Sequence, residues 1–257
     1  MKQTEKYLLR GLTIEKLKIS NTLVPWLTLS APLFVVTVAF VAAYSGGEKV
    51  YRPGINPWEN FAGHVLVGWS LFVFPIYLSL QSALYAGIEH QSRAWAYLYS
   101  LPVPKWAIHL SKLIMLAVLV ATSHIALFFF AEGAGWILGL VRPSYGFQYY
   151  SLHNVLATAS ASLFVAGLGM IALQWLVSLY FESFLVPAAL GLFATMAGAV
   201  SRGFAASDVS PYLWPTAMLN ATLDMSEWRF SYLLISLLFG AMASAMGIWL
   251  LRRKVTG

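Results

Sequence analysis

Residues 113–131 read LIMLAVLVATSHIALFFFA and contain no charged side chain. A helix of roughly 20 apolar residues crosses about 30 Å of hydrocarbon, the thickness of a bilayer core. Five further charge-free stretches lie along the chain, at 19–47, 60–88, 143–181, 183–201 and 230–251. A helix satisfies all its backbone hydrogen bonds over runs of this length inside lipid. The sequence therefore predicts an all-α membrane protein with six transmembrane helices.

The composition indicates a chain that faces lipid rather than water. Hydrophobic residues make up 59% of the 257 residues and charged residues 10%, whereas a soluble domain carries roughly 25% charged residues. A soluble enzyme is thereby excluded. The chain has no cysteine, which excludes disulfides and thiolate metal clusters. Its basic residues stand singly between apolar runs or near the two ends, without the patch that nucleic-acid binding requires.

The distribution of Lys and Arg predicts the orientation in the membrane. We expect one transmembrane domain over residues 1–257, with spans at 23–44, 62–86, 108–131, 153–179, 184–201 and 230–251. Six spans place both termini on the same side. With the termini in the cytoplasm, the outer connections hold Lys49, Arg52, Arg142, Arg202 and Arg229, and the other 11 of the 16 Lys and Arg residues lie inside. This asymmetry is typical of cytoplasmic termini.

Three segments outside the spans have patterns of their own. Residues 1–20 are expected to form an amphipathic helix along the cytoplasmic surface, although Glu15 interrupts its apolar face. A basic leader that only sets orientation is the alternative. Residues 202–229 are too apolar for a solvated loop and too rich in proline to span, which favours short re-entrant helices in the outer leaflet. Glu182 is the only charge between the fourth and fifth spans, so these two helices should form a tight hairpin.

Residues 88–106, between the second and third spans, should form a short cytoplasmic helix. Trp95 and Tyr99 are four residues apart and give it an aromatic face. Glu89 and Arg93 have the same spacing and can pair. Pro102 then ends the helix with a rigid turn.

Catalytic motifs are weak or missing from the sequence. Gly68-Trp69-Ser70 resembles the nucleophile region of a rhomboid-type intramembrane protease, but Leu71 stands where a glycine is expected, and packing between helices is the favoured interpretation. The five histidines have no metal-binding spacing such as His-x-x-x-His. His124 should be neutral and hydrogen-bonded inside the bundle. The sequence has no Gly-Lys-Ser or Gly-Lys-Thr triplet of a P-loop, so any ATP must be bound by another chain.

The order of these features resembles the permeases of type-2 ATP-binding-cassette (ABC) exporters. The shared features are a basic surface helix, six spans, a helix that starts at Glu89 and is followed by Leu101-Pro102 and Lys112, and a partly apolar outer loop before the last span. Residues 10–20 (RGLTIEKLKIS) and 178–184 (SLYFESF) are most similar to the lantibiotic-immunity and bacitracin-resistance type permeases. The resemblance covers essentially the whole chain.

The resemblance implies a surface that docks on an ATPase subunit. In this family the helix between spans two and three enters a cleft of the ATPase, and the hairpin between spans four and five adds a smaller contact. Carried over to this sequence, the docking residues are Glu89, His90, Gln91, Arg93, Trp95, Leu101, Pro102 and Glu182. Aromatic residues at a membrane boundary are also ordinary interfacial residues, which leaves a second interpretation of Trp95.

The resemblance also implies a translocation path along spans two and five. The candidate residues are Trp69, Phe72, Tyr77, Gln81 and Met196. Tyr77 and Gln81 are four residues apart and share a helix face, which packing between spans explains equally well.

The function implied by the resemblance is that of a permease in a bacterial cytoplasmic membrane, not an enzyme itself. It would move an amphipathic substrate, such as a peptide, lipid or drug, outward with a second copy or a homologous permease. Two ATPase subunits would bind the ATP and Mg, and this chain would hold no cofactor or metal. An ATP-independent channel or scramblase, an intramembrane enzyme using Ser70, and a structural membrane subunit are the alternatives.

Overall fold

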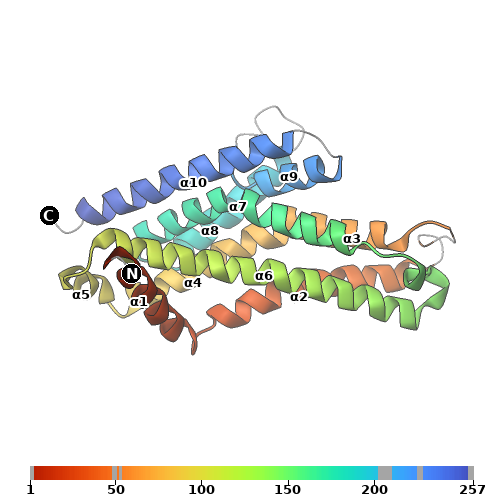
Figure 1. The fold of residues 1–257 in the computed structure, drawn as a ribbon, viewed down its shortest axis with the longest axis horizontal. Coiled ribbons are helices and arrows are strands. Elements are labelled where there is room, and N and C mark those ends of the chain that lie inside the picture. Colours follow the sequence, from red (N-terminus) through yellow and green to blue (C-terminus); the bar gives the residue numbers. More distant parts are fainter. Residues whose placement is uncertain (1–2, 48–50, 52–53, 202–209, 225–227, 254–257) are drawn as a thin grey trace.

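The fold is a bundle of long helices with α1 and α5 at one end (Figure 1). The computed structural model describes residues 3–47, 51, 54–201, 210–224 and 228–253. The first half of the chain contains α1 (Gln3–Ile19), α2 (Val24–Gly46), α3 (Pro57–Gly68), η1 (Trp69–Val73), α4 (Phe74–Gln91), α5 (Ala94–Ser100) and α6 (Lys105–Val141). The second half contains η2 (Pro143–Tyr145), η3 (Phe147–Tyr149), α7 (His153–Tyr180), α8 (Leu185–Ser201), α9 (Trp214–Leu223) and α10 (Trp228–Arg253). Every regular element over these residues is a helix, as expected.

Among the described residues, five helical segments are long and apolar enough to cross a membrane. They are Val24–Gly46, Pro57–Gln91, Lys105–Val141, His153–Tyr180 and Phe230–Leu250. Helix α8 is apolar but has 17 residues, which give it a length of about 25 Å. That α8 crosses the membrane as a sixth span therefore stays a prediction.

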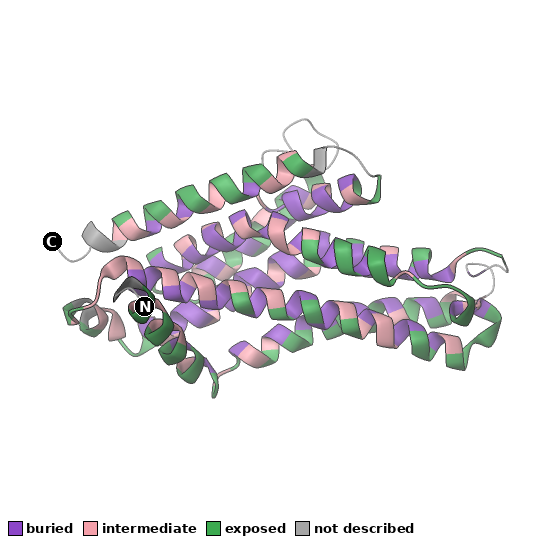
Figure 2. Cartoon of the chain, in the orientation of Figure 1, coloured by how far each residue is buried: buried purple, intermediate pink, exposed green. Residues whose placement is uncertain are grey.

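The long helices carry exposed residues along their outer faces (Figure 2), and many of these are large and apolar. Phe193 on α8, Trp136 on α6 and Met242 on α10 are among the large hydrophobic side chains that lie exposed. In a water-soluble protein a surface of this kind would drive association, whereas lipid accommodates it. The exposed apolar faces therefore support a multi-pass membrane protein.

The second span is one continuous run of α3, η1 and α4 with a widened turn in its middle. Asn56 caps its start, because its side chain accepts a hydrogen bond from the Trp58 amide at 3.1 Å, and Pro57 fits the first turn. The widened turn is the π-helix η1, which ends two residues before Pro75. Pro75 has no amide proton, so the hydrogen-bond ladder is already interrupted there. The run extends beyond the expected limits of 62–86.

Helix α6 continues well beyond the limit of 131 that the charge pattern suggested. The charge that marked this limit, Glu132, lies inside the helix, and its Oε2 atom is 2.7 Å from Nδ1 of His153 at the start of α7. The 37 residues of α6 give it a length of about 55 Å. Near its far end, the Trp58 indole donates to the Phe147 carbonyl at 3.1 Å and closes the α6–α7 connection onto α3.

Within 202–229, where short re-entrant helices are expected, the described residues form the short helix α9, and its entry into the outer leaflet stays a prediction. Trp214, Met218 and Leu219 are buried, and α9 packs against α7 and α10. Just before α9, the Tyr212 hydroxyl donates to the side-chain oxygen of Gln174 on α7. Residues 202–209 and 225–227 lie outside the described residues. Helix α9 thus lies against protein.

Helix α7 lies at the centre of the bundle and contacts α4, α6, α9 and α10. Small residues bring its neighbours close: the ring of Phe74 on α4 lies where a side chain at Gly167 would be. Trp69, Trp175 and Tyr85 are among the largest fully buried side chains. Packing through glycine and serine is typical of helices that associate within a membrane.

Candidate functional site

The link between α4 and α6 lies at the end of the bundle that carries α1 (Figure 1). Helix α4 ends at Gln91, and Arg93 has a φ of 50°, which turns the chain sharply before α5. This corrects the expectation of one helix over 88–106. Because α4 ends before Arg93, Glu89 belongs to the last turn of α4, and its carboxylate contacts Lys18 and Lys112 instead of Arg93.

His90 connects α5 to the end of α7. The Trp95 indole donates to Nδ1 of His90 at 3.1 Å, and Nε2 of His90 is 3.0 Å from the carbonyl oxygen of Ser178. A neutral imidazole with its proton on Nε2 satisfies both contacts, since Nδ1 then accepts and Nε2 donates. The two turns α4–α5 and α7–α8 are thereby held side by side.

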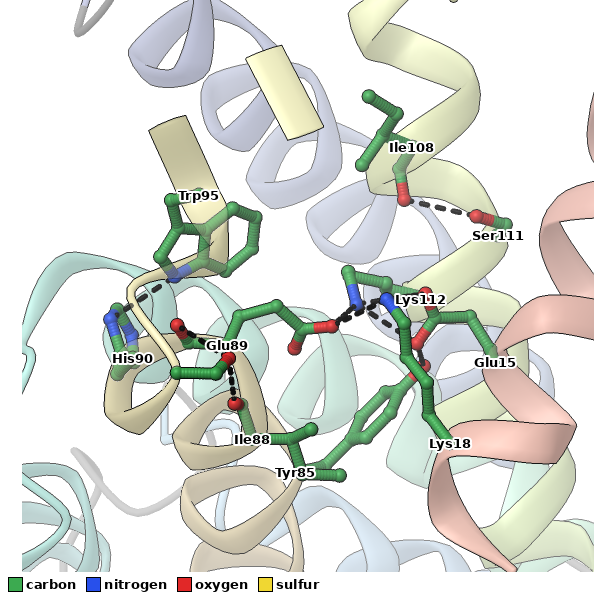
Figure 3. A network of polar contacts seen from close by, with 11 residues as sticks. Glu15, Lys18, Tyr85, Ile88, Glu89, His90, Trp95, Ile108, Ser111 and Lys112 are labelled. Atoms are coloured by element: carbon green, nitrogen blue, oxygen red, sulfur yellow. Dashed lines mark hydrogen bonds and ion pairs between the residues drawn. The ribbon is translucent and has the colours of Figure 1, made fainter. Parts of the chain in front are cut away.

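Four charged side chains meet beneath α5 and form what we call the buried ionic cluster: Glu15, Lys18, Glu89 and Lys112 (Figure 3). Nζ of Lys112 lies 2.8 Å from Oε2 of Glu15 and also donates to Oε1 of Glu89. Nζ of Lys18 lies 2.9 Å from Oε1 of Glu89. The Tyr85 hydroxyl donates to Oε2 of Glu15 at 2.6 Å. The formal charges cancel, and α1, α4 and α6 are joined at one point.

The burial of these charged side chains requires compensation, because isolated charges are costly in an apolar environment. Burial alone would raise the pKa of Glu15, but the ammonium of Lys112 and the Tyr85 hydroxyl hold that pKa below its usual value. Burial would likewise lower the pKa of Lys18, and the carboxylates of Glu89 and Glu15 raise it instead. Glu15 and Lys18 are therefore both charged at neutral pH.

Trp95 joins the short helix α5 to the buried ionic cluster. Nζ of Lys112 lies 5.7 Å from the centre of the Trp95 ring and 5.4 Å from that of Tyr85. Both distances are within the range of a cation–π interaction. Since Trp95 also bonds His90, α5 is connected through these contacts to α4, α6 and α7.

The residues expected to dock on an ATPase divide into three groups. Gln91, Arg93, Pro102 and Glu182 are exposed, whereas His90, Trp95 and Leu101 are partly buried. Glu89 is 1% exposed, so its expected place on the docking surface is corrected: its carboxylate points inward to Lys112. Tyr97 on α5, which the sequence did not single out, is 67% exposed.

The candidate path residues do not share one surface. Trp69, Tyr77 and Gln81 are buried, and the Gln81 amide donates to Thr28 and to the Val24 carbonyl of α2. Phe72 and Met196 are 40% and 41% exposed. Within one copy of the chain, the first three residues therefore join the second span to its neighbours, and only Phe72 and Met196 face outward.

His124 lies in the bundle interior, as its position in a span suggested. Its Nδ1 is 2.9 Å from the Val120 carbonyl, and its Nε2 accepts from the Trp69 indole at 3.2 Å. Ser70, the candidate nucleophile, donates to the Val67 carbonyl at 3.4 Å and lies 3.5 Å from the Thr216 hydroxyl. These contacts support helix packing as the role of Ser70. Among the residues that the structure describes, no group of three His, Cys, Asp or Glu could hold a metal ion.

Sequence reasoning missed the roles of Glu15 and Lys112. Glu15 stood out only as an interruption of an apolar face, and Lys112 only as a residue of the family resemblance that follows Leu101-Pro102, with no partner assigned to it. A carboxylate that is buried requires a cationic partner. This requirement was the signal that could have pointed to an ion pair at Glu15. The partner lies 97 residues away in the sequence, so spacing could not identify it.

Comparison with known proteins assigns the chain to a family. No curated protein and no solved structure matches it significantly. A model of the ABC-2 family transporter proteins matches residues 12–198, which include α2 to α7, most of α8 and the buried ionic cluster. Together with the apolar helices, this match identifies the chain as a member of the ABC-2 transporter family and the membrane-spanning permease of an ABC transporter.

Proposed function

We propose that this permease belongs to an exporter, in which it moves an amphipathic substrate outward with energy from ATP hydrolysed by two separate ATPase subunits. The substrate class is a peptide, lipid or drug, and a second permease, identical or homologous, completes the pair. The observation that carries the proposal is the attachment of α5. Through Trp95, this short helix contacts His90 and Lys112, and through them the ends of α4, α6 and α7.

The proposed docking surface consists of the exposed residues around α5: Gln91, Arg93, Tyr97, Pro102 and Glu182. The His90–Ser178 contact supports grouping Glu182 with the others, because Ser178 lies one turn before the α7–α8 connection. Tyrosine and arginine are frequent at the energetic centres of protein interfaces. Both charged residues of this surface, Arg93 and Glu182, are exposed, where they can meet complementary charges on an ATPase.

The proposed mechanism is a shift between two arrangements of the bundle. ATP and Mg bind to the ATPase pair, and its closure moves α5. Because α5 is tied to three helices, they move with it as a unit and change access to the path between the two permeases. Such gating requires only that the ATP-bound state favours one arrangement over the other.

The docking surface is tested by Tyr97→Ala and Arg93→Glu in the full permease, expressed with its ATPase. Loss of a residue at the energetic centre of an interface costs about 2 kcal/mol of binding free energy, which is about a thirtyfold weaker association. We expect both variants to insert normally but to lose most of the co-purified ATPase. Glu59→Gln, an exposed change on α3, is the matched control and should leave association intact.

Two results would contradict the proposal. One is stoichiometric ATPase and full nucleotide-dependent transport in both variants, which would place docking elsewhere. The other is transport by the permease alone in liposomes at an undiminished rate, which would favour a channel or scramblase.

A further inference from the structure

A cavity of about 190 Å³ lies between α1 and the start of α6, at the end of the bundle that carries α5 (Figure 1). Helix α1 forms one wall, which includes the basic side chains of Arg10 and Lys18. The other wall comes from α5, the turn after it and α6, and it is apolar at Leu101, Val103 and Ile108. The proposed docking residues lie outside this lining. The two walls together fit a ligand that has a polar and an apolar part.

The charge of the cavity favours an anion. Lys18 is held by the carboxylates of Glu15 and Glu89, within a cluster whose formal charges cancel. Arg10 stands apart from that cluster, because it is exposed and forms no ion pair with any of the described residues. The lining therefore keeps one uncompensated positive charge. A guanidinium can bind phosphate through two parallel N–H···O hydrogen bonds, so a phosphate group suits this position.

The depth of the cavity matches the headgroup layer of a membrane. On α6 the lining residues Ala107, Ile108 and Ser111 come two to six residues before the charge-free stretch 113–131. At 1.5 Å per residue, they lie about 3 to 9 Å along the helix from the end of that stretch. The headgroup layer extends about 5 to 8 Å beyond each side of the hydrocarbon core. Lipid phosphates thus lie at the level of the cavity.

The rim of the cavity is open to the bilayer on the side of α1. Ile14, a lining residue, is 51% exposed, and Leu17, about one turn further along α1, is 69% exposed. Exposed apolar side chains on a basic helix are typical of a helix that lies in the membrane interface. The cavity volume equals that of about six water molecules in the liquid. It therefore holds a phosphodiester group but not two acyl chains, which must continue outside it.

We propose that this cavity binds the headgroup of an anionic phospholipid from the adjoining leaflet, with Arg10 on the phosphate and the glycerol end of the lipid against Leu101 and Val103. The acyl chains extend past Ile14 into the bilayer. Phosphatidylcholine also has a phosphate, but its positively charged choline is repelled by Arg10. The site therefore prefers phosphatidylglycerol. It requires only membrane insertion, so it stands or falls independently of the docking surface.

The probe for this site is phosphatidylglycerol, added to the full permease in a neutral detergent, and native mass spectrometry measures the affinity of the first bound lipid. Phosphatidylcholine with the same acyl chains is the reference and should bind more weakly. Arg10→Gln should weaken phosphatidylglycerol binding about tenfold, because hydrogen bonds between charged groups are lost. Lys16→Gln removes the same charge from an exposed position of α1 outside the lining and should leave the affinity unchanged.

Three results would overturn the proposal. The first is equal affinity for phosphatidylglycerol and phosphatidylcholine. The second is an effect of Arg10→Gln no larger than that of Lys16→Gln, which would leave no role for the cavity. The third is displacement of the lipid by an equal concentration of glycerol 3-phosphate, which would indicate a site for soluble anions. Because Arg10 and Lys16 are both exposed, both variants should fold, and unchanged thermal unfolding would verify this.

Discussion

At the scale of single residues, Lys112 is the side chain on which the buried ionic cluster depends. Its ammonium contacts Glu15 and Glu89, and the side chain is completely buried. Lys112→Met preserves the apolar stem but leaves two carboxylates with only Lys18. Removing one partner of a buried ion pair costs about 3 to 5 kcal/mol. We expect a clear decrease in the thermal unfolding midpoint of the detergent-solubilised permease.

The matched control at this scale restores the charge balance. In the double variant Lys112→Met, Glu89→Gln, one carboxylate and one ammonium remain, and Glu15 and Lys18 lie 3.3 Å apart. Replacing a buried ionic group by a neutral one of similar size is far less costly than leaving a charge unpaired. The double variant should therefore be more stable than Lys112→Met alone. Equal stability of the two would show that charge balance does not hold the cluster together.

At the scale of helices, α8 depends on close contact with α4. A side chain at Gly191 of α8 would collide with Ser79 of α4, so this position has no room for even a methyl group. Overpacking of this kind costs about 1 to 3 kcal/mol. We expect Gly191→Ala to lower the unfolding midpoint although alanine favours the helix. Gly133→Ala on α6 is the control, because a side chain there meets open space and should leave stability equal or higher.

The helices themselves were predictable from charge-free runs, but their limits were not. The sequence placed an end of α6 at Glu132, which a contact with His153 allows to stay inside the helix. It also joined residues 88–106 into one helix, because nothing in the spacing reveals that Arg93 adopts a left-handed backbone conformation. Glycine is the usual signal for such a turn, and arginine is not. Neither limit therefore follows from local propensity.

At the scale of the whole molecule, composition and hydropathy predicted the all-helical membrane fold. Both features reflect the solvent around the helices, which acts on every residue. The pairing of helices was not predictable, because it depends on small contacts such as Trp69 with His124 or Gly191 with Ser79. The candidate site was likewise predictable only in part, because some of its contacts depend on how the helices pair. Its exposed residues follow from their place between spans, whereas the partners of Glu89 come from α1 and α6.

The orientation of the molecule is a prediction that the absence of cysteine makes easy to test. Single cysteines at Lys16→Cys on α1, Ser183→Cys between α7 and α8, and Gln148→Cys between α6 and α7 are all at exposed positions. The excess of Lys and Arg near α1 and α5 predicts that this end lies in the cytoplasm. A membrane-impermeant maleimide added to intact cells should therefore label Gln148→Cys alone, and all three variants should react after lysis. Labelling of Lys16→Cys in intact cells would reverse the orientation and place the buried ionic cluster on the side away from ATP.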